Sequence, residues 1–242
     1  MSIPLSRQPL ASRHPTSRGI GLVLAAVCLV PLPAPTQQPA RTPDQEAAYT
    51  RTLTQRADRI VAGLGLTDPN KATRVRELIV RQYRALSAVH DALDAQVKVA
   101  GTARGDSQEA TQAAITAARQ QARAKLDALH AEYLASLAAE LSPEQVDRVK
   151  DGMTYGIAQV TYDAYLKMLP DLTDAQKRQI RAWLLEAREL AMDEGSAEAK
   201  HRVFGRYKGK INNYLSAAGY DLKQAERNLR TSQPPAPAAK TP

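Results

Sequence analysis

Residues 141–145 read LSPEQ, and this short stretch carries a full set of helix-start signals. The hydroxyl of Ser142 suits the capping position, where it accepts a hydrogen bond from a free backbone N–H of the first turn. Pro143 suits the first helical position, and Gln145 is placed to reach back to the capping residue. The stretch therefore predicts a helix that begins at Ser142.

The same chemistry recurs along the chain, as LTDAQ at residues 172–176, TPDQ at 42–45 and LTDP at 66–69. Between these starts the apolar residues follow helical spacing, and no stretch alternates as a strand does. The sequence predicts an all-α fold, an elongated helical bundle of about six to seven helices. The expected helical segments are 43–62, 68–99, 106–140, a helix from 142 interrupted near Gly152 and Gly156, a tyrosine-rich segment 160–169, then 173–194, 196–217 and a short turn 222–229.

Segments 68–99 and 106–140 are the longest, and only a short turn separates them. At about 1.5 Å per residue they predict an antiparallel helical hairpin on the order of 50 Å long. The apolar stripe of the first segment comprises Val75, Ile79, Leu86, Leu93 and Val97. In the turn, Asp106 or Ser107 is expected to cap the second segment.

The N-terminal 36 residues contain no acid. Three arginines lie in the first 18 residues, and an apolar run follows them at residues 19–32. This pattern predicts a cleaved signal peptide over residues 1–36 and a periplasmic or secreted protein. The run is shorter than the ~20 residues of a spanning helix and contains proline, so no stable membrane insertion is expected after cleavage. Cys28 is preceded by Val27 where lipid attachment needs a small residue, so a lipoprotein is not favoured.

Composition bounds the rest of the chain. Residues 37–42 and 231–242 are rich in Pro, Gln, Thr and Ala and predict a disordered linker and tail around one helical domain at 43–230. Cys28 is the sole cysteine, so the mature chain has no disulfide, thiol chemistry or cysteine zinc site. The net charge of +8 falls to +5 without the signal peptide, which is too mild to indicate nucleic acid as a partner.

Two histidines lie on the apolar stripes of the hairpin. The hairpin register places His90 opposite residue 116 and His130 opposite residue 76, so the two are not expected to meet. We interpret both as structural, and the sequence contains no HExxH zinc signature. No metal ligands are predicted.

Four carboxylates, Asp147, Asp151, Asp163 and Asp171, cluster in sequence around the irregular centre. A glycosidase needs two acids roughly 5–10 Å apart across a cleft, but acids are also common on solvated helix faces. Neither GxGxxG nor GxxxxGKS is present. The sequence predicts no catalytic residue and no cofactor, and it leaves an enzymatic role open without favouring one.

The segment at residues 195–223 has an unusual composition for a surface helix. Gly205, Gly209, Asn212 and Ser216 share one smooth helical face, beside a basic stripe that includes Arg206. Each interior glycine costs about 1 kcal/mol relative to alanine. Two interpretations remain open: another helix packs very closely against this face, or a ligand approaches the backbone there.

Tyr155 stands between Gly152 and Gly156 and is expected to face solvent, whereas Tyr162 and Tyr165 follow core spacing. Aromatic rings stack on the apolar faces of sugars, while Lys, Arg and Asn donate hydrogen bonds to hydroxyl or acidic groups. The mixture suits a carbohydrate ligand, neutral or anionic. The candidate ligand-binding residues are Tyr155, Lys200, His201, Arg206, Tyr207, Lys208, Lys210, Asn212 and Asn213.

The run from DGMTYGIAQVTYDAY at residue 151 to AAGYDLK at residue 223 resembles DUF3826, a family of secreted bacterial proteins. The resemblance extends over about residues 46–230 and is most specific in the second half. It implies a sugar-binding protein of bacteria that degrade plant polysaccharides. It supplies no catalytic residues.

A weaker resemblance concerns LSPEQ and LTDAQ, which are similar to the LTxxQ motifs of the periplasmic Spy and CpxP proteins. That similarity implies a helical stress chaperone, expected to form a cradle-shaped dimer with an exposed apolar face. Shared capping chemistry explains the same residues equally well. The oligomeric state is left open.

Overall fold

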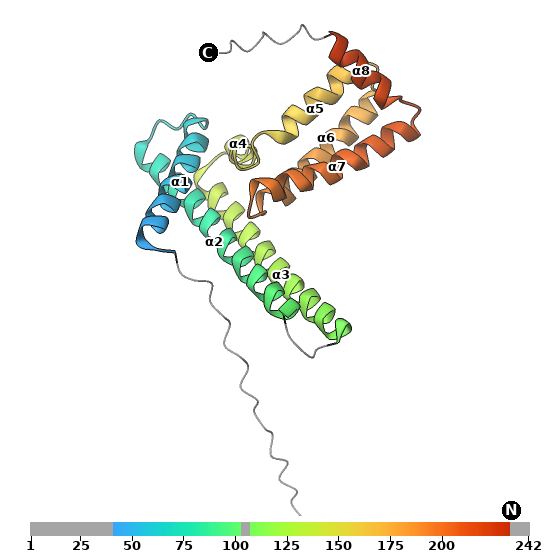
Figure 1. Ribbon diagram of the computed structural model, residues 1–242. Coiled ribbons are helices and arrows are strands. Elements are labelled where there is room, and N and C mark those ends of the chain that lie inside the picture. The colour runs from blue at the N-terminus through green and yellow to red at the C-terminus, as the bar shows by residue number, and fades with distance from the viewer. Residues whose placement is uncertain (1–40, 103–106, 233–242) are drawn as a thin grey trace, which may run out of the picture. The chain divides into compact units, whose positions relative to one another are not determined.

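Eight helices make up the computed structural model, which describes residues 41–102 and 107–232. They are α1 (Pro43–Ala62), α2 (Pro69–Thr102), α3 (Gln108–Glu140), α4 (Pro143–Met153), α5 (Ile157–Met168), α6 (Asp174–Met192), α7 (Ala197–Ala217) and α8 (Leu222–Ser232) (Figure 1). The predicted signal peptide, Cys28, residues 37–40 of the linker and most of the tail lie outside the described residues. Among the described helices, none combines the length and apolarity needed to cross a membrane.

The all-α prediction is confirmed, and no strand occurs in residues 41–102 or 107–232. The helices number eight instead of six to seven for two reasons. The interruption at Gly152 and Gly156 separates α4 fully from α5, and the expected C-terminal turn is a helix, α8, that runs two residues beyond the predicted domain end.

Three capping boxes fix helix starts as the sequence predicts. Thr42, Ser142 and Thr173 each accept a hydrogen bond from the backbone N–H three residues on, and the glutamine there accepts from the backbone of the cap. Such caps stabilise by about 1 kcal/mol each. Two of the glutamines also reach other segments: Gln145 Nε2 donates to Leu64 O (3.1 Å), and Gln176 Oε1 accepts from the Tyr220 hydroxyl (3.0 Å).

Helices α2 and α3 form the predicted antiparallel hairpin and lie side by side along their length (Figure 1). Arg74 at the start of α2 donates two hydrogen bonds to Glu140 at the end of α3 (2.8 and 2.9 Å). In α2 the fully buried positions stop at Leu86, and in α3 they begin at Ala122. The far part of the hairpin therefore buries its side chains only partly.

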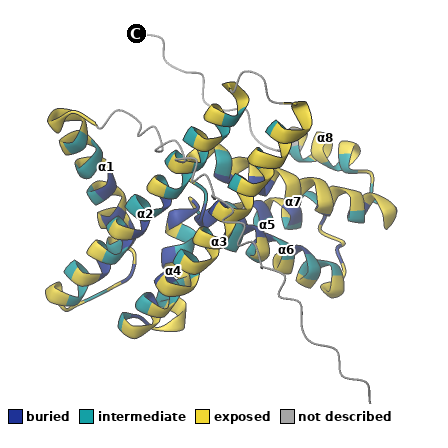
Figure 2. Ribbon diagram, turned by 90° about the horizontal axis from the view of Figure 1, so that it is seen from below, coloured by how far each residue is buried: buried dark blue, intermediate teal, exposed yellow. Residues whose placement is uncertain are grey.

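The buried side chains form two separate clusters. Helices α1 to α4 enclose the first cluster, and α5 to α8 enclose the second. Met192 at the end of α6 belongs to the first cluster and so links the two halves. Figure 2 shows the buried residues where helices meet and exposed residues along their outward faces.

Gly152 marks a close approach between α1 and α4. A Cβ added there would lie 2.7 Å from Cγ1 of Ile60 and 3.2 Å from its Cγ2. Ile60 is branched at Cβ and almost fully buried, so it has little freedom to move away. The helices meet at this distance because residue 152 has no side chain.

Replacing Gly152 by alanine is expected to lower the free energy of unfolding by about 1–3 kcal/mol, because the added methyl group overpacks against Ile60. Gly209→Ala is the matched control, since a Cβ at that helical position meets nothing within 4 Å. The control should raise stability by about 1 kcal/mol through helix propensity. Urea unfolding of both variants measures the difference, and equal effects would contradict the close approach.

Candidate functional site

Tyr155 occupies a strained position in the turn between α4 and α5. The backbone N–H of Gly156 donates to Asp151 O (2.8 Å) and that of Tyr155 to Gly152 O (3.4 Å), which is the Schellman pattern of a helix end. Tyr155 has φ 59°, in the position where glycine is usual, and no other described non-glycine residue has positive φ. This conformation costs a side chain about 1–2 kcal/mol. The residue is nevertheless 50% exposed, so packing does not explain its presence.

His201 in the second turn of α7 lies beside this ring. The two ring centroids are 6.4 Å apart and the planes differ by 10°, a parallel stack near the upper limit of contact. Ser196 caps α7 through the N–H of Ala199 (3.1 Å) and so fixes where His201 projects. Two predicted site residues from distant segments thus come together.

Two further residues, Tyr83 of α2 and Arg56 of α1, contribute to the electrostatics of this region. Burial raises the pKa of Tyr83 to about 12, with an added contribution from Tyr155 and an opposing one from Arg56. Tyr155 and Arg56 therefore each act on the hydroxyl of Tyr83. Neither stands out in the sequence, since Tyr83 continues an ordinary core stripe and Arg56 is one of many helical arginines.

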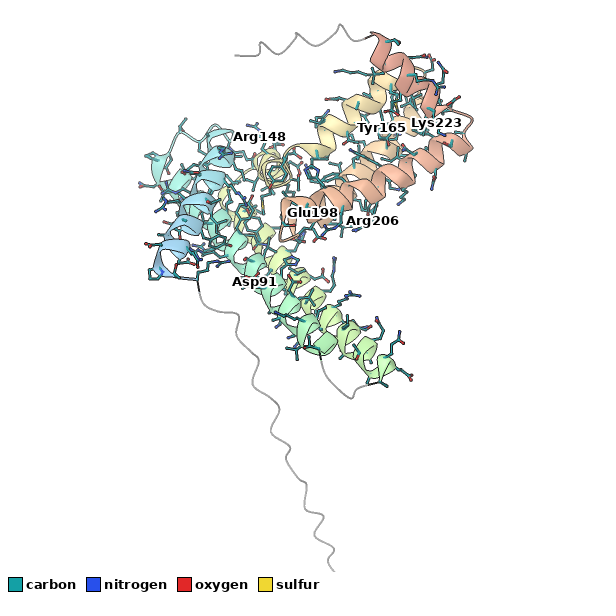
Figure 3. The ribbon with its side chains drawn as sticks, in the orientation of Figure 1. Asp91, Arg148, Tyr165, Glu198, Arg206 and Lys223 are labelled. Atoms are coloured by element: carbon teal, nitrogen blue, oxygen red, sulfur yellow. The ribbon has the colours of Figure 1, made fainter. Side chains whose placement is uncertain are left out.

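The glycine face of α7 is open. A Cβ added at Gly205 or at Gly209 meets nothing within 4 Å, and both residues are exposed. Helix α5 touches only the edge of this face, where the Tyr165 hydroxyl donates to Asn212 Oδ1 (2.6 Å) and lies 3.4 Å from Lys208 O (Figure 3). The interpretation that a helix packs closely there is wrong.

The remaining predicted site residues divide between two surfaces. Arg206, Lys208 and Asn213 are exposed along α7, and Figure 3 shows Arg206 projecting outward from that helix. Tyr207 and Lys210 instead face α6. The Lys210 ammonium lies 4.6 Å from the centroid of Trp183 and 5.4 Å from that of Tyr207.

Two names are used below. The Tyr155 surface comprises Tyr83, Tyr155, His201, Gly205, Lys208, Gly209 and Asn212. The α6–α7 aromatic cluster comprises Trp183, Tyr207, Lys210 and Tyr214.

Lys200 was expected to contact a ligand, but its side chain is buried, with 3% of the residue exposed. Its ammonium donates to Met192 O (3.2 Å). Burial lowers the pKa of Lys200 to about 8, Arg56 acts in the same direction, and Asp193 opposes both. This placement corrects the prediction for Lys200, because its side chain lies beneath the surface while the neighbouring His201 is exposed.

Asp193, directly after α6, ties this region to the hairpin. His130 Nδ1 donates to Asp193 Oδ2 and His90 Nε2 donates to Asp193 O, both at 2.8 Å. The two histidines therefore converge on one residue, which corrects the expectation from hairpin register. Burial raises the pKa of Asp193, while His130 and Lys200 oppose the change. The ring of His90 also lies 2.8 Å from where a Cβ of Gly195 would be, so that glycine permits the contact.

Two of the four carboxylates considered for glycoside hydrolysis, Asp147 and Asp151, share a structural partner. Arg188 of α6 donates to Asp147 (2.6 Å) and Asp151 (2.9 Å) of α4. The void beside Asp151 and Arg188 measures about 30 Å³, the room that one water molecule takes. It is too small for a sugar. Within the described residues, no group of three or more His, Cys, Asp or Glu side chains is arranged to hold a metal ion.

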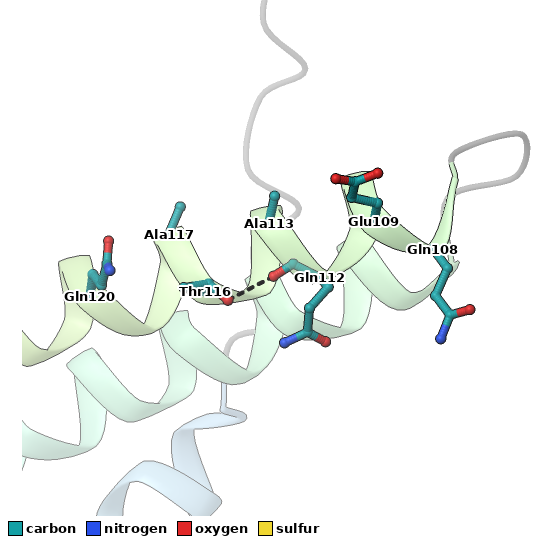
Figure 4. A pocket seen from close by; sticks show the side chains of 7 residues that line it. All are labelled: Gln108, Glu109, Gln112, Ala113, Thr116, Ala117 and Gln120. Atoms are coloured by element: carbon teal, nitrogen blue, oxygen red, sulfur yellow. Dashed lines mark hydrogen bonds between the residues drawn. The ribbon is translucent and has the colours of Figure 1, made fainter.

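A larger hollow of about 750 Å³ lies at the far end of the hairpin. Its described lining comes from α3 alone, comprising Gln108, Glu109, Gln112, Ala113, Thr116, Ala117 and Gln120. Figure 4 shows these side chains fanning out along one helix, with Thr116 donating to Gln112 O (2.8 Å). A binding site needs polar groups that converge from several elements, so this hollow supports no site.

Residues 50–232 match the model of DUF3826, a protein family of unknown function. The match runs from the middle of α1 to the end of α8, so both core clusters and the Tyr155 surface lie inside it. A search of curated proteins gave no match.

Tyr155→Gly is expected to raise the free energy of unfolding by about 1 kcal/mol, because glycine adopts positive φ without strain. Tyr155→Ala keeps the strain and should not gain stability. Thermal unfolding of both variants separates the two effects. A loss of more than about 1 kcal/mol in Tyr155→Gly would mean that the ring is there for packing.

Lys200 should give stability a distinct pH dependence. Its pKa is about 8 when folded and 10.5 in the reference state, so between these values the unfolded chain binds more protons and stability rises with pH. Relative to Lys200→Met, the wild-type free energy of unfolding should increase by about 2 kcal/mol from pH 7.5 to 9.5. Urea unfolding across this range measures it, with the exposed Lys167→Met as control. If the difference in free energy of unfolding between the wild type and Lys200→Met does not change with pH, Lys200 is not a buried lysine with a lowered pKa.

Proposed function

The chain belongs to the DUF3826 family, and on that premise we propose that it is an exported, non-enzymatic protein that binds carbohydrate at the Tyr155 surface. The observation that carries the proposal is the exposed ring of Tyr155, held in a strained backbone conformation beside His201. A strained backbone conformation that no buried contact offsets is typical of functional positions. The sugar binding implied by the family resemblance agrees with this.

A flat aromatic ring provides a large apolar surface at little entropic cost, which suits the C–H face of a sugar ring. His201 adds a second ring and a hydrogen-bonding nitrogen next to it. The parallel rings therefore supply both the apolar platform and a polar group that orients the ligand.

The open backbone of α7 extends this platform. Gly205 and Gly209 each cost about 1 kcal/mol relative to alanine, and no neighbouring side chain or helix accounts for them. A ligand that lies directly on the helix backbone would account for both. On this interpretation the two glycines leave space for the sugar.

Polar groups for hydroxyl recognition border the glycine face. Because Tyr165 donates to Asn212 Oδ1, the amide of Asn212 is oriented and its N–H groups are left to donate elsewhere. Lys208 is exposed on the same edge. A few fixed donors beside an apolar platform are the usual composition of a small-molecule site.

The chaperone alternative receives less support. In the described residues the exposed large hydrophobics are Val99, Tyr155 and Val160, which lie on separate elements and form no continuous apolar face. The two LTxxQ-like motifs serve as capping boxes whose glutamines hold loops. Helix capping accounts for them without a chaperone role.

Tyr155→Ala is expected to weaken sugar binding at least tenfold, because it removes the stacking platform. Glycan arrays identify a ligand among neutral and acidic oligosaccharides, and calorimetry then measures its affinity. Arg206→Ala should weaken binding less, since Arg206 borders the surface. Gly209→Ala should weaken binding while it raises stability, because the new methyl group stands where the ligand lies.

Tyr207→Ala provides the matched control, because Tyr207 lies on the same helix but faces α6. It should leave the affinity within twofold. If Tyr207→Ala abolishes binding and Tyr155→Ala does not, the ligand sits at the α6–α7 aromatic cluster instead. If no oligosaccharide binds, the proposed function is wrong.

A further inference from the structure

The contacts between α7 and the segment formed by Tyr155 and α5 include two that lie far apart along both. At one end the ring of Tyr155 stacks on that of His201, with 6.4 Å between the centroids. At the other end the hydroxyl of Tyr165 donates to Asn212 Oδ1 (2.6 Å). Tyr165 follows Tyr155 by ten residues, and Asn212 follows His201 by eleven. The segment and α7 therefore run in the same direction between the two contacts, from the side of α4 toward α8 (Figure 1).

The separation of these two contacts indicates how long a ligand of the Tyr155 surface can be. From His201 to Asn212 the helix advances roughly 16 Å, or about three turns, because each residue adds ~1.5 Å. One helical turn of ~5.4 Å is close to the length that one pyranose ring adds to a linear sugar chain. Both His201 and Asn212 are exposed. The face of α7 between them therefore has the length of three sugar residues in a row.

The two glycines of α7 lie on this face, one and two turns after His201. A Cβ added at Gly205 or at Gly209 meets nothing within 4 Å, so the helix backbone is accessible at both positions. A monosaccharide stacked on Tyr155 would cover about one turn of α7 and account for Gly205 alone. Gly209 costs a further ~1 kcal/mol relative to alanine, and a ligand that continues along the helix accounts for it as well.

The Asn212 end of the face offers hydrogen-bond donors. Burial raises the pKa of Tyr165 to about 12, so its hydroxyl keeps its proton at neutral pH and donates to Asn212 Oδ1. The amide of Asn212 is thereby oriented, and its N–H groups are left to donate to a ligand. Lys208, one turn earlier and exposed, adds a second donor on the same face. The two ends therefore differ in chemistry, with a stacking platform at Tyr155 and fixed donors at Asn212.

We propose that the Tyr155 surface binds three consecutive residues of a linear oligosaccharide laid along α7. One outer ring stacks on Tyr155 and His201. The central ring lies on the helix backbone at Gly205 and Gly209, and the other outer ring receives hydrogen bonds from Asn212. The inference rests on the proposed carbohydrate function and adds its ligand class, a linear chain instead of a monosaccharide.

Calorimetry with sugars of increasing length tests the proposal. The probes are xylose to xylopentaose and galacturonate to pentagalacturonate, together with the same length series of any sugar that the glycan array identifies. Affinity is expected to rise at least tenfold from the monosaccharide to the trisaccharide. From the trisaccharide to the pentasaccharide it should rise less than fivefold, because a longer chain gains only additional ways to place three residues on the surface.

Two outcomes overturn the inference and leave the proposed function standing. One is equal affinity for the monosaccharide and the trisaccharide. The other is a rise of fivefold or more beyond three residues, which would mean that the ligand continues past Asn212. If no sugar of any length binds, the inference and the proposed function fail together.

Variants then assign the two ends of the chain. Asn212→Ala should bring the trisaccharide to the affinity of the disaccharide, and Tyr165→Phe, which removes only the hydroxyl that orients Asn212, should lose part of the same advantage. Tyr155→Ala should weaken all lengths by a similar factor. Asn213→Ala is the matched control, because the same exposed side chain there lies on a different face of α7. A trisaccharide advantage that survives Asn212→Ala, or that Asn213→Ala removes equally, overturns the inference.

Discussion

The hydrogen bonds that converge on Asp193 determine where α7 begins relative to the hairpin. His130 from α3 binds its carboxylate and His90 from α2 binds its backbone carbonyl, both at 2.8 Å. Such bonds tolerate little change in distance or angle, so they fix the turn after α6 more narrowly than apolar contact would. His201, and with it the parallel ring pair, takes its position from that turn.

The seam between the two core clusters is mainly polar. Arg188 joins α6 to α4 through Asp147 and Asp151, and Lys150 of α4 binds Glu189 of α6 (2.8 Å). Arg188 is buried, while its partner Asp147 is exposed and Asp151 is partly exposed, and such pairs bring little net stability, since the cost of removing the arginine from water offsets much of the attraction. Their value here is geometric: they set the angle at which two apolar clusters meet, beside the turn that displays Tyr155.

Local chemistry made much of the fold predictable. Capping side chains act within one helical turn. The sequence alone therefore predicted the helices that begin at Thr42, Ser142 and Thr173. The exposure of Tyr155 followed in the same way from the glycines on either side of it. Family membership was likewise recognisable from the second half of the chain.

What the sequence did not reveal depends on how helices face each other. Periodicity indicates which side of a helix is buried but not which helix packs against it, so nothing in the sequence indicated that Tyr83 lies near Tyr155. The shared contact of His90 and His130 was missed for a related reason. Both histidines bind Asp193 in the turn after α6, and the register of the hairpin says nothing about where that turn lies.

The contact between His90 and Gly195 has a consequence for how this fold diverges. The imidazole occupies the volume that any side chain at position 195 would need. Position 195 is therefore restricted to glycine until position 90 has become smaller, and a smaller residue at position 90 gives up the hydrogen bond to Asp193 O. The two sites form an ordered pair, and the accessible evolutionary route through them runs in one direction.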